Sequence, residues 1–178
     1  MNSFRIAIMS LFAGIFMATG CDSTPKSTGS SVTDLVVYNA PPSICRHDMG
    51  NDNRTHGDLI AWHADLAVDL DESRIGNGNG SSARVVGDCN GTMIVTREMR
   101  SGDDREHRMT NIELDWSDSP DSIMIVGSHE YRQGTVETDT AIPRAITGGT
   151  GRCTGAMGQM TSARLANGWH RHEIRFVD

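Results

Sequence analysis

Apolar and polar residues alternate over much of the chain after position 57. From Ile60 to Val68 the apolar residues fall mostly on every second position, with His63 and Asp65 between them, the two-residue repeat of a half-buried strand. The same alternation returns in 112–116 and 123–127. The segments between such runs are rich in glycine, asparagine and aspartate, as hairpin turns are: 77–80, 87–91, 101–104 and 167–168.

The pattern predicts an all-β fold of about eight strands. No stretch shows a convincing helical repeat with caps, so we expect any helix to be short. Closing the sheet removes exposed strand edges, which favours an eight-stranded antiparallel closed barrel of the calycin-like kind over an open sandwich. The expected strands are roughly 34–40, 58–69, 82–87, 91–99, 108–116, 122–131, 155–166 and 169–177.

The first twenty residues have the pattern of an export signal. Arg5 is the only charge, and the apolar or small run 6–18 is too short to span a bilayer, which takes roughly 20 residues. The small residues before Cys21 resemble the lipobox of bacterial lipoproteins, although that family prefers leucine where Ala18 stands. The resemblance implies cleavage after 1–20 and a lipid on Cys21, with an ordinary secretory signal as the alternative.

The chain beyond the signal divides into a tether and one domain. Residues 21–32 are mostly Ser, Thr, Gly, Pro and Lys, and we expect a solvated linker there. Residues 33–178 are long enough for one barrel domain. The lipid would anchor this domain to a membrane of the bacterial cell envelope, on the periplasmic or extracellular face. A net charge of -7 without a Lys/Arg cluster argues against nucleic acid as a partner.

Three cysteines remain if Cys21 carries lipid. An exported protein can form disulfides, and Cys45 and Cys89 both lie in turn-rich segments, so we expect at most one bridge, between these two. Cys153 then reads as a small buried hydrophobic residue. No cysteine pair has the spacing of a zinc site, and neither a metal nor a cofactor is expected.

A glycine-rich segment near the C-terminus resembles a family signature. Residues 145–151 read Ala-Ile-Thr-Gly-Gly-Thr-Gly and 155–159 read Gly-Ala-Met-Gly-Gln, similar to the A-I-T-G-G-x-G-x-x-x-G-A-x-G-Q signature of allene oxide cyclases and, more loosely, to dirigent proteins. An earlier block, from Gly57-Asp58-Leu59-Ile60 to Gly80, resembles the same family in the same order. The resemblance implies a barrel with an apolar lumen, often assembled as a homotrimer. Three glycines in five residues also predict a tight chain reversal with positive φ angles.

A dinucleotide-binding loop is the rival interpretation of the same glycines. That motif needs a helix after it and a further strand beyond. The residues after Gly151 alternate as strands do, so we set this interpretation aside.

The family's catalytic side chains are mostly replaced here. Allene oxide cyclases hold an epoxide in an apolar tunnel and polarise it with a carboxylate and a bound water. Where the resemblance implies that glutamate, this chain has Asn39, and Pro41 and Ala64 stand where asparagines are expected. Ser82 falls about where a lumen cysteine belongs.

Histidine is the residue that the lumen offers instead. The resemblance implies that His129 takes the place of a lumen aromatic residue, and alternation puts His170 and His172 on one face of the last strand. Two imidazoles at this spacing could exchange protons or bind a metal, although a half-buried structural role is the simpler interpretation. A calcium loop at 69–79 lacks the ligand order of a known one.

Three functions remain open from the sequence. The leading one is a membrane-tethered barrel that binds a small apolar or aromatic molecule in its lumen. The expected contacts are Asn39, Trp62, Ser82, His129, Tyr131 and His170. The second is an isomerase or cyclase, or a dirigent-like protein, that steers a reactive intermediate with His129 or His172 as proton-transfer group. The third is a structural envelope protein with a solid interior.

Overall fold

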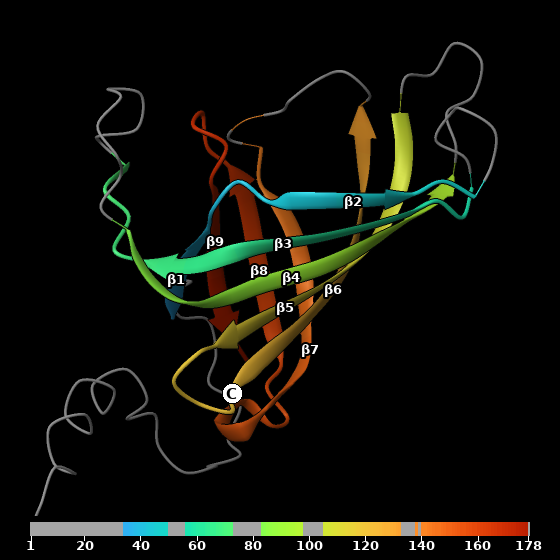
Figure 1. Cartoon of the computed structure of the whole chain (residues 1–178). Helices are drawn as coiled ribbons and strands as arrows, with labels where there is room; N and C mark the ends of the chain where they lie inside the picture. The colour runs from blue at the N-terminus through green and yellow to red at the C-terminus, as the bar shows by residue number, and fades with distance from the viewer. Residues whose placement is uncertain are drawn as a thin grey trace, which may run out of the picture. The chain divides into compact units, whose positions relative to one another are not determined.

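The computed structural model describes residues 34–49, 56–72, 83–97, 105–132, 138 and 140–177. These residues form nine antiparallel strands, and the short 3-10 helix η2 connects two of them (Figure 1). The elements are β1 (Leu35–Asn39), β2 (Ser43–His47), β3 (Leu59–Val68), β4 (Arg84–Arg97), β5 (Arg105–Trp116), β6 (Ser122–Arg132), β7 (Ile142–Thr150), η2 (Gly151–Cys153), β8 (Gly158–Arg164) and β9 (His170–Phe176).

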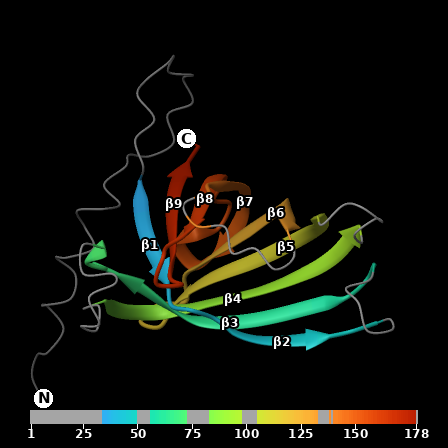
Figure 2. The same cartoon turned by 90° about the horizontal axis from the view of Figure 1, so that it is seen from above.

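Eight of the strands form a closed barrel, as the sequence predicts. The sheet order is β1-β9-β8-β7-β6-β5-β4-β3-β2, and an additional pairing of β1 with β3 closes the circuit. Tyr38 pairs with Ala67 and Asn39 with Leu66 at this joint. Strand β2 lies outside the circuit and pairs with the first half of β3 (Figure 2). The sequence analysis missed β2, whose residues are all exposed and so carry no burial pattern.

Aliphatic side chains fill one end of the barrel interior. Alternate residues of the strands point inward, so each strand contributes to one packed cluster. Among the buried members are Val37, Leu66, Leu114, Ile123, Ile125, Ile146, Met160 and Ile174. This cluster makes that end of the barrel a packed core.

The structure corrects the boundary between two predicted strands. Residues 82–87 and 91–99 are predicted as separate strands around a turn at 87–91, but β4 runs unbroken from Arg84 to Arg97. Gly87 and Gly91 are needed for close approach within the sheet, since a Cβ on Gly87 would lie 1.8 Å from the carbonyl oxygen of Asp115. Glycine therefore marks a crowded sheet position here, not a hairpin.

The glycine-rich segment is partly strand and partly turn. Residues 142–150 form β7, which the sequence analysis missed, and the chain then reverses through η2. Gly151 has a φ of +57°, and a Cβ there would lie 2.1 Å from Oδ1 of Asp121. Asp121 in turn accepts hydrogen bonds from the backbone N–H and Nε of Arg152, at 2.8 and 2.7 Å. The predicted tight reversal is thus confirmed at Gly151, at the end of the glycine-rich segment.

The predicted disulfide between Cys45 and Cys89 is wrong. Both residues are free thiols, and Cys45 is exposed on β2 whereas Cys89 is buried inside the barrel. Cys45 pairs with Ala61 and Cys89 with Ala64, three positions apart along β3, which is about 10 Å. This separation, with the thiols on opposite faces of the sheet, exceeds the reach of a disulfide. Cys153 is buried, as predicted.

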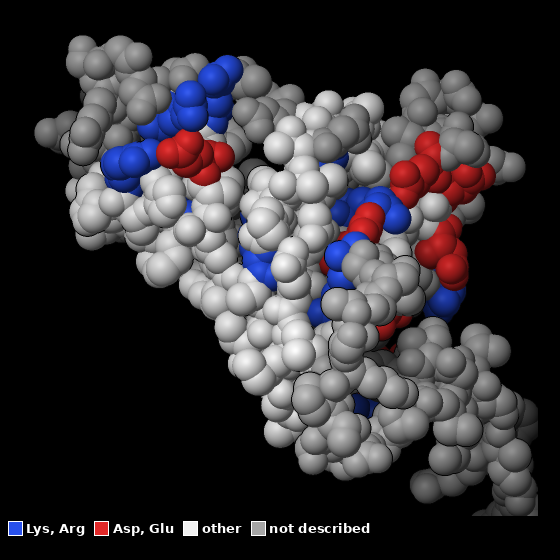
Figure 3. All heavy atoms as spheres, turned by 180° about the vertical axis from the view of Figure 1, so that it is seen from behind, with Lys and Arg blue, Asp and Glu red and all other residues white. Residues whose placement is uncertain are grey.

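Charged side chains on the outer surface are arranged in pairs of opposite sign. Glu130 binds Arg97 and Arg105, at 2.7 and 3.2 Å, at the free ends of β4, β5 and β6. Figure 3 shows this mixture of charges at the upper left of the rear face, above a mostly uncharged band. Glu130 therefore pairs with both arginines, and its single negative charge balances one of the two positive charges.

The predicted signal, tether, lipidated Cys21 and Ser82 lie outside the described residues. Within the described residues, no helix has the length and apolar character needed to cross a membrane.

Candidate functional site in the barrel interior

Polar side chains line the second half of the barrel interior. They lie on the same inward faces as the aliphatic core, one or two inward positions further along each strand. From β1 round to β9 they are Asn39, Trp62, Thr110, His129, Arg144, Ser162, His170 and His172. Several of their polar atoms are buried and have no hydrogen-bond partner: Trp62 Nε1, Thr110 Oγ1, His129 Nδ1, Arg144 Nε and Nη1, and His170 Nδ1.

Trp62 lies flat against a glycine of the neighbouring strand. It pairs in register with Gly91 of β4, and a Cβ on Gly91 would lie 2.3 Å from the indole Cε2 and Cζ2 atoms. Any larger residue at position 91 would push the ring out of place. The indole Nε1 is buried and has no acceptor, so its N–H can donate a hydrogen bond to a molecule inside the barrel.

Arg144 is buried because Gly127 makes room for it. Arg144 lies on β7, on the same face as the core residue Ile146, and its relative exposure is 8%. A Cβ on Gly127 of β6 would lie 2.7 Å from Cγ of Arg144. Burial lowers the pKa of Arg144 to about 10, which still leaves the guanidinium charged at neutral pH.

The other buried arginine of this region has its own carboxylate. Arg108 and Glu106 of β5 form a buried ion pair, with exposures of 5% and 0%. The guanidinium carbon of Arg108 also lies 3.9 Å from the centre of the Tyr131 ring. Among the ion pairs of the described residues none involves Arg144. Of these two buried arginines, Arg144 is therefore the one that no carboxylate of the described residues balances.

His172 is held on both ring nitrogens. Asn39 Nδ2 donates to the Ala40 carbonyl at 2.7 Å, which turns its Oδ1 toward His172 Nε2, also at 2.7 Å. Nε2 must then carry the proton and donate, so Nδ1 accepts from the Ser162 hydroxyl at 2.9 Å. Burial, with the neighbouring His170 and Arg144, lowers the pKa of His172 to about 3. This imidazole is neutral at pH 7 and has no free nitrogen for a substrate.

His129 and His170 are neutral and have a free nitrogen. Burial, followed by the nearby charges of Arg144 and Arg108, lowers the pKa of His129 to about 4. Burial, followed by Arg164 and Arg144, lowers the pKa of His170 to about 4. The His170 ring stacks on His172 with centroids 6.4 Å apart. Both can donate to or accept from a molecule in the interior.

The structure places nearly all the predicted lumen residues on the inward face: Asn39, Trp62, His129, Tyr131, His170 and His172. Ser82 lies outside the described residues. Arg144 was missed, because β7 was not predicted as a strand. The alternation of Ile142, Arg144 and Ile146 is the signal that could have found it.

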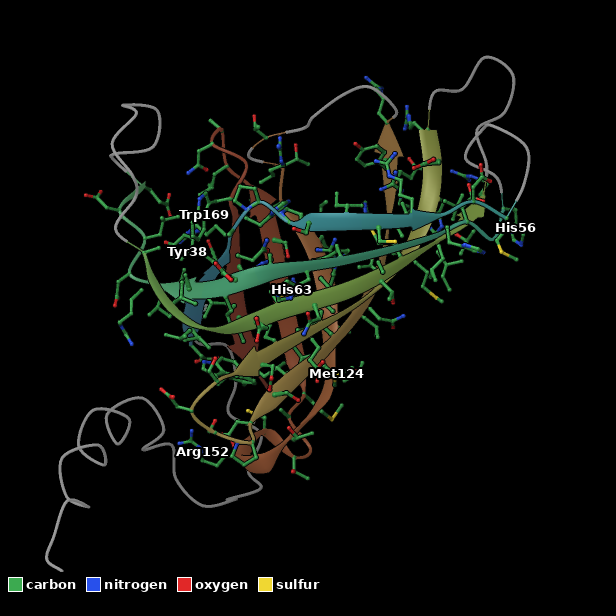
Figure 4. The ribbon with its side chains drawn as sticks, viewed as in Figure 1. Tyr38, His56, His63, Met124, Arg152 and Trp169 are labelled. Carbon is green, nitrogen blue, oxygen red and sulfur yellow. The ribbon has the colours of Figure 1, made fainter. Side chains whose placement is uncertain are left out.

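A second cluster of polar residues lies on the outside of the barrel. His63, Asp65 and Asp88 bring ligand atoms within 4.8 Å of one another, and His63 Nδ1 lies 2.9 Å from Asn90 Oδ1. Figure 4 labels His63 on the outer face of β3. This group of metal-ligand types is thus separate from the interior site.

Comparison with known proteins gives a match in fold. No protein-family model matches the chain, and no curated protein matches it. Among 23 matching chains of solved structures is one named pyocyanin demethylase. It has a TM-score of 0.56 and 20% sequence identity, over 80% of this chain and 98% of that chain. At this identity the likeness shows a shared fold, so the chain is similar to a barrel protein known from a solved structure.

Proposed function

We propose that this barrel binds a small apolar or aromatic molecule in its lumen. The observation that carries the proposal is the set of buried, unpartnered polar atoms around one half of the interior: Trp62 Nε1, Thr110 Oγ1, His129 Nδ1, Arg144 Nε and Nη1, and His170 Nδ1. Leaving a buried polar group unpaired costs about 1–3 kcal/mol. A molecule that supplies acceptors at these positions recovers that free energy on binding.

The surrounding side chains suit a flat molecule. Trp62 presents an indole ring, and His170 and His172 present two stacked imidazoles on the last strand. Such rings bury large area and favour offset stacking. An apolar body with a few placed polar contacts is the ordinary composition of a ligand site.

The structural neighbour supports use of this fold for small-molecule chemistry. Its name states that it demethylates pyocyanin. The resemblance to allene oxide cyclases points the same way and remains a prediction from the sequence.

We further propose that the barrel is tethered to a membrane of the cell envelope by a lipid on Cys21. The signal-like segment 1–20 and the polar tether 21–32 support this, and the tether gives the barrel reach from the surface.

A catalytic function is the second candidate, and the neutral histidines favour it. His129 and His170 have unpartnered Nδ1 atoms and stay uncharged at pH 7, as a general base requires. His172 fits this role less well than the sequence analysis expected, because both of its ring nitrogens are bonded. An isomerase or cyclase would use His129 or His170 for proton transfer. Turnover of an unstable epoxide that survives His129→Gln and His170→Gln together would contradict this role.

Native mass spectrometry of the full chain purified from its own cells tests the proposed binding. We expect the folded protein to carry added mass that is lost on denaturation, and the same spectrum counts subunits and so tests the trimer. Trp62→Ala should release that mass. Trp169→Ala is the matched control, because Trp169 packs in a separate apolar cluster with Tyr38, Leu70 and Leu165. Wild-type protein that carries no added mass, or equal retention in both variants, would contradict lumen binding at this site.

A further inference from the structure

We infer that the lumen selects an anion: a flat aromatic acid whose carboxylate or equivalent acidic oxygens pair with Arg144. This inference rests on the proposed lumen binding and specifies the chemical class of the ligand. Of the two buried arginines of this region, Arg144 is the one without an ion pair among the described residues, and it lies one inward position from the core residue Ile146.

The charge of Arg144 is buried without compensation. Its exposure is 8%, and Nε and Nη1 have no hydrogen-bond partner. Glu106, a carboxylate buried in the same interior, pairs with Arg108. A buried cation without a counter-ion is costly, whereas a planar guanidinium binds two carboxylate oxygens at once. An acidic ligand would therefore gain affinity from a group that the protein's own side chains leave unpaired.

The neighbours of Arg144 are donors or neutral groups. Its charge acts on His129, His170 and His172, which places all three imidazoles near it. His129, His170 and Trp62 each have a buried, unpartnered ring nitrogen, and the indole nitrogen can only donate. These groups can complete the hydrogen bonding of acidic oxygens on the side away from the guanidinium.

A second arginine extends the positive field toward the end of β8. Arg164 has the inward parity of Met160 and Ser162 on that strand, and its charge acts on His170. No ion pair of Arg164 occurs among the described residues. The chain as a whole carries a net charge of -7. A cationic interior within an acidic protein is the arrangement that would draw a small anion inward.

Matched probes separate the anion inference from simple lumen binding. Equilibrium dialysis of the full chain, with the same detergent on both sides, measures 2-naphthoate and 2-naphthamide, which share size and ring but differ in charge. We expect 2-naphthoate to bind at least about tenfold more tightly, a difference of about 1.4 kcal/mol. Octanoate, which has the same head group without the ring, should bind more weakly than 2-naphthoate.

Substitution of the arginine assigns the effect to the site. Arg144→Gln should reduce 2-naphthoate affinity to that of 2-naphthamide and leave the amide unchanged. Arg84→Gln is the control, because Arg84 is exposed on the outside and pairs with Asp69. If Arg144→Gln does not fold, the same affinities are measured on Arg144→Met. The ratio of 2-naphthoate to 2-naphthamide affinity in the wild type then serves as the reference.

The outcomes are distinguishable. Equal affinity for acid and amide in the wild type, or an acid preference that survives Arg144→Gln, would overturn the anion inference while lumen binding stands. Octanoate binding as tightly as 2-naphthoate would overturn the aromatic part. Binding of none of the three probes, together with no added mass in the native spectrum, would overturn the proposed function itself.

Discussion

Gly127 of β6 gives Arg144 of β7 its place in the barrel, because a Cβ at position 127 would lie 2.7 Å from Cγ of the arginine. We predict that Gly127→Val displaces the guanidinium and lowers the free energy of unfolding by about 1–3 kcal/mol, as overpacking does. Urea denaturation measures the change. Ala145→Val is the control, because Ala145 is exposed on the outward face of β7 and should change stability by less than about 0.5 kcal/mol. Equal effects of the two would contradict the close packing.

Removing the buried charge should stabilise the barrel. We predict that Arg144→Met raises the free energy of unfolding by about 1–3 kcal/mol, because unpaired buried donors disappear while the aliphatic contact with Gly127 stays. Thermal unfolding of the ligand-free protein measures it. A variant less stable than the wild type would show that Arg144 has a stabilising partner. If Arg144→Met is more stable and also binds the aromatic acid less tightly, Arg144 favours binding at the expense of stability, as is common for residues of a binding site.

Stability should fall steeply below pH 6.5. Burial lowers the pKa of His129 and His170 to about 4 and of His172 to about 3, against about 6.5 for a free imidazole. The unfolded chain takes up these protons first, so the stabilisation is complete above pH 6.5 and is lost as the pH falls toward 4. Each histidine adds up to about 1.4 kcal/mol per pH unit in that window.

Urea midpoints between pH 7 and 4.5 measure this slope. His172→Gln should reduce it, and Ala145→Val, on the exposed outward face of β7, should not. The lowered pKa of Asp121, which Arg152 holds by hydrogen bonds, acts in a separate window below about 4. A slope unaffected by His172→Gln would contradict the burial of an uncharged imidazole.

The three cysteines of the barrel should differ in reactivity. Cys45 is exposed, whereas burial raises the pKa of the Cys89 thiol to about 12 and raises that of Cys153. We predict that a maleimide labels Cys45 in the native protein and labels Cys89 and Cys153 at least about a hundredfold more slowly. Intact mass after labelling in urea gives the total. A mass lower by two hydrogens before labelling would show a disulfide and contradict the free thiols.

Lipid attachment should depend on Cys21 alone. We predict that radiolabelled palmitate is incorporated into the wild type and into Cys45→Ala, and not into Cys21→Ala. Gel autoradiography of labelled cells measures incorporation. Label that persists in Cys21→Ala would contradict the anchor.

Alternation predicted the fold because most strands bury one face. The same alternation correctly placed Trp62 and His172 on the inward side. It failed where a strand has no buried face, as in β2, and where glycines were taken for a turn, as at Gly87 and Gly91. The groups for which these two glycines make room lie on other strands, so local sequence does not reveal them.

The prediction from alternation also missed Arg144, for a related reason. β7 begins with Ile142 and Pro143, and proline weakens a strand prediction. Pairing with β6 begins only at Ala145, so Pro143 lies where β7 has β8 as its neighbour. An inward arginine also breaks the rule that inward residues are apolar. Only the contact with Gly127, which is seventeen positions away in the chain, accounts for it.

The joint between β1 and β3 is short, with two residue pairs against ten between β3 and β4. Local opening of the barrel therefore occurs most readily between β1 and β3, because the fewest backbone hydrogen bonds must break there. Asn39 belongs to that joint and also holds His172 through a 2.7 Å hydrogen bond. When β1 separates from β3, the His172 imidazole therefore becomes exposed to water. A proton that it takes up at low pH gives it a charge that opposes reburial, and the two strands then stay apart.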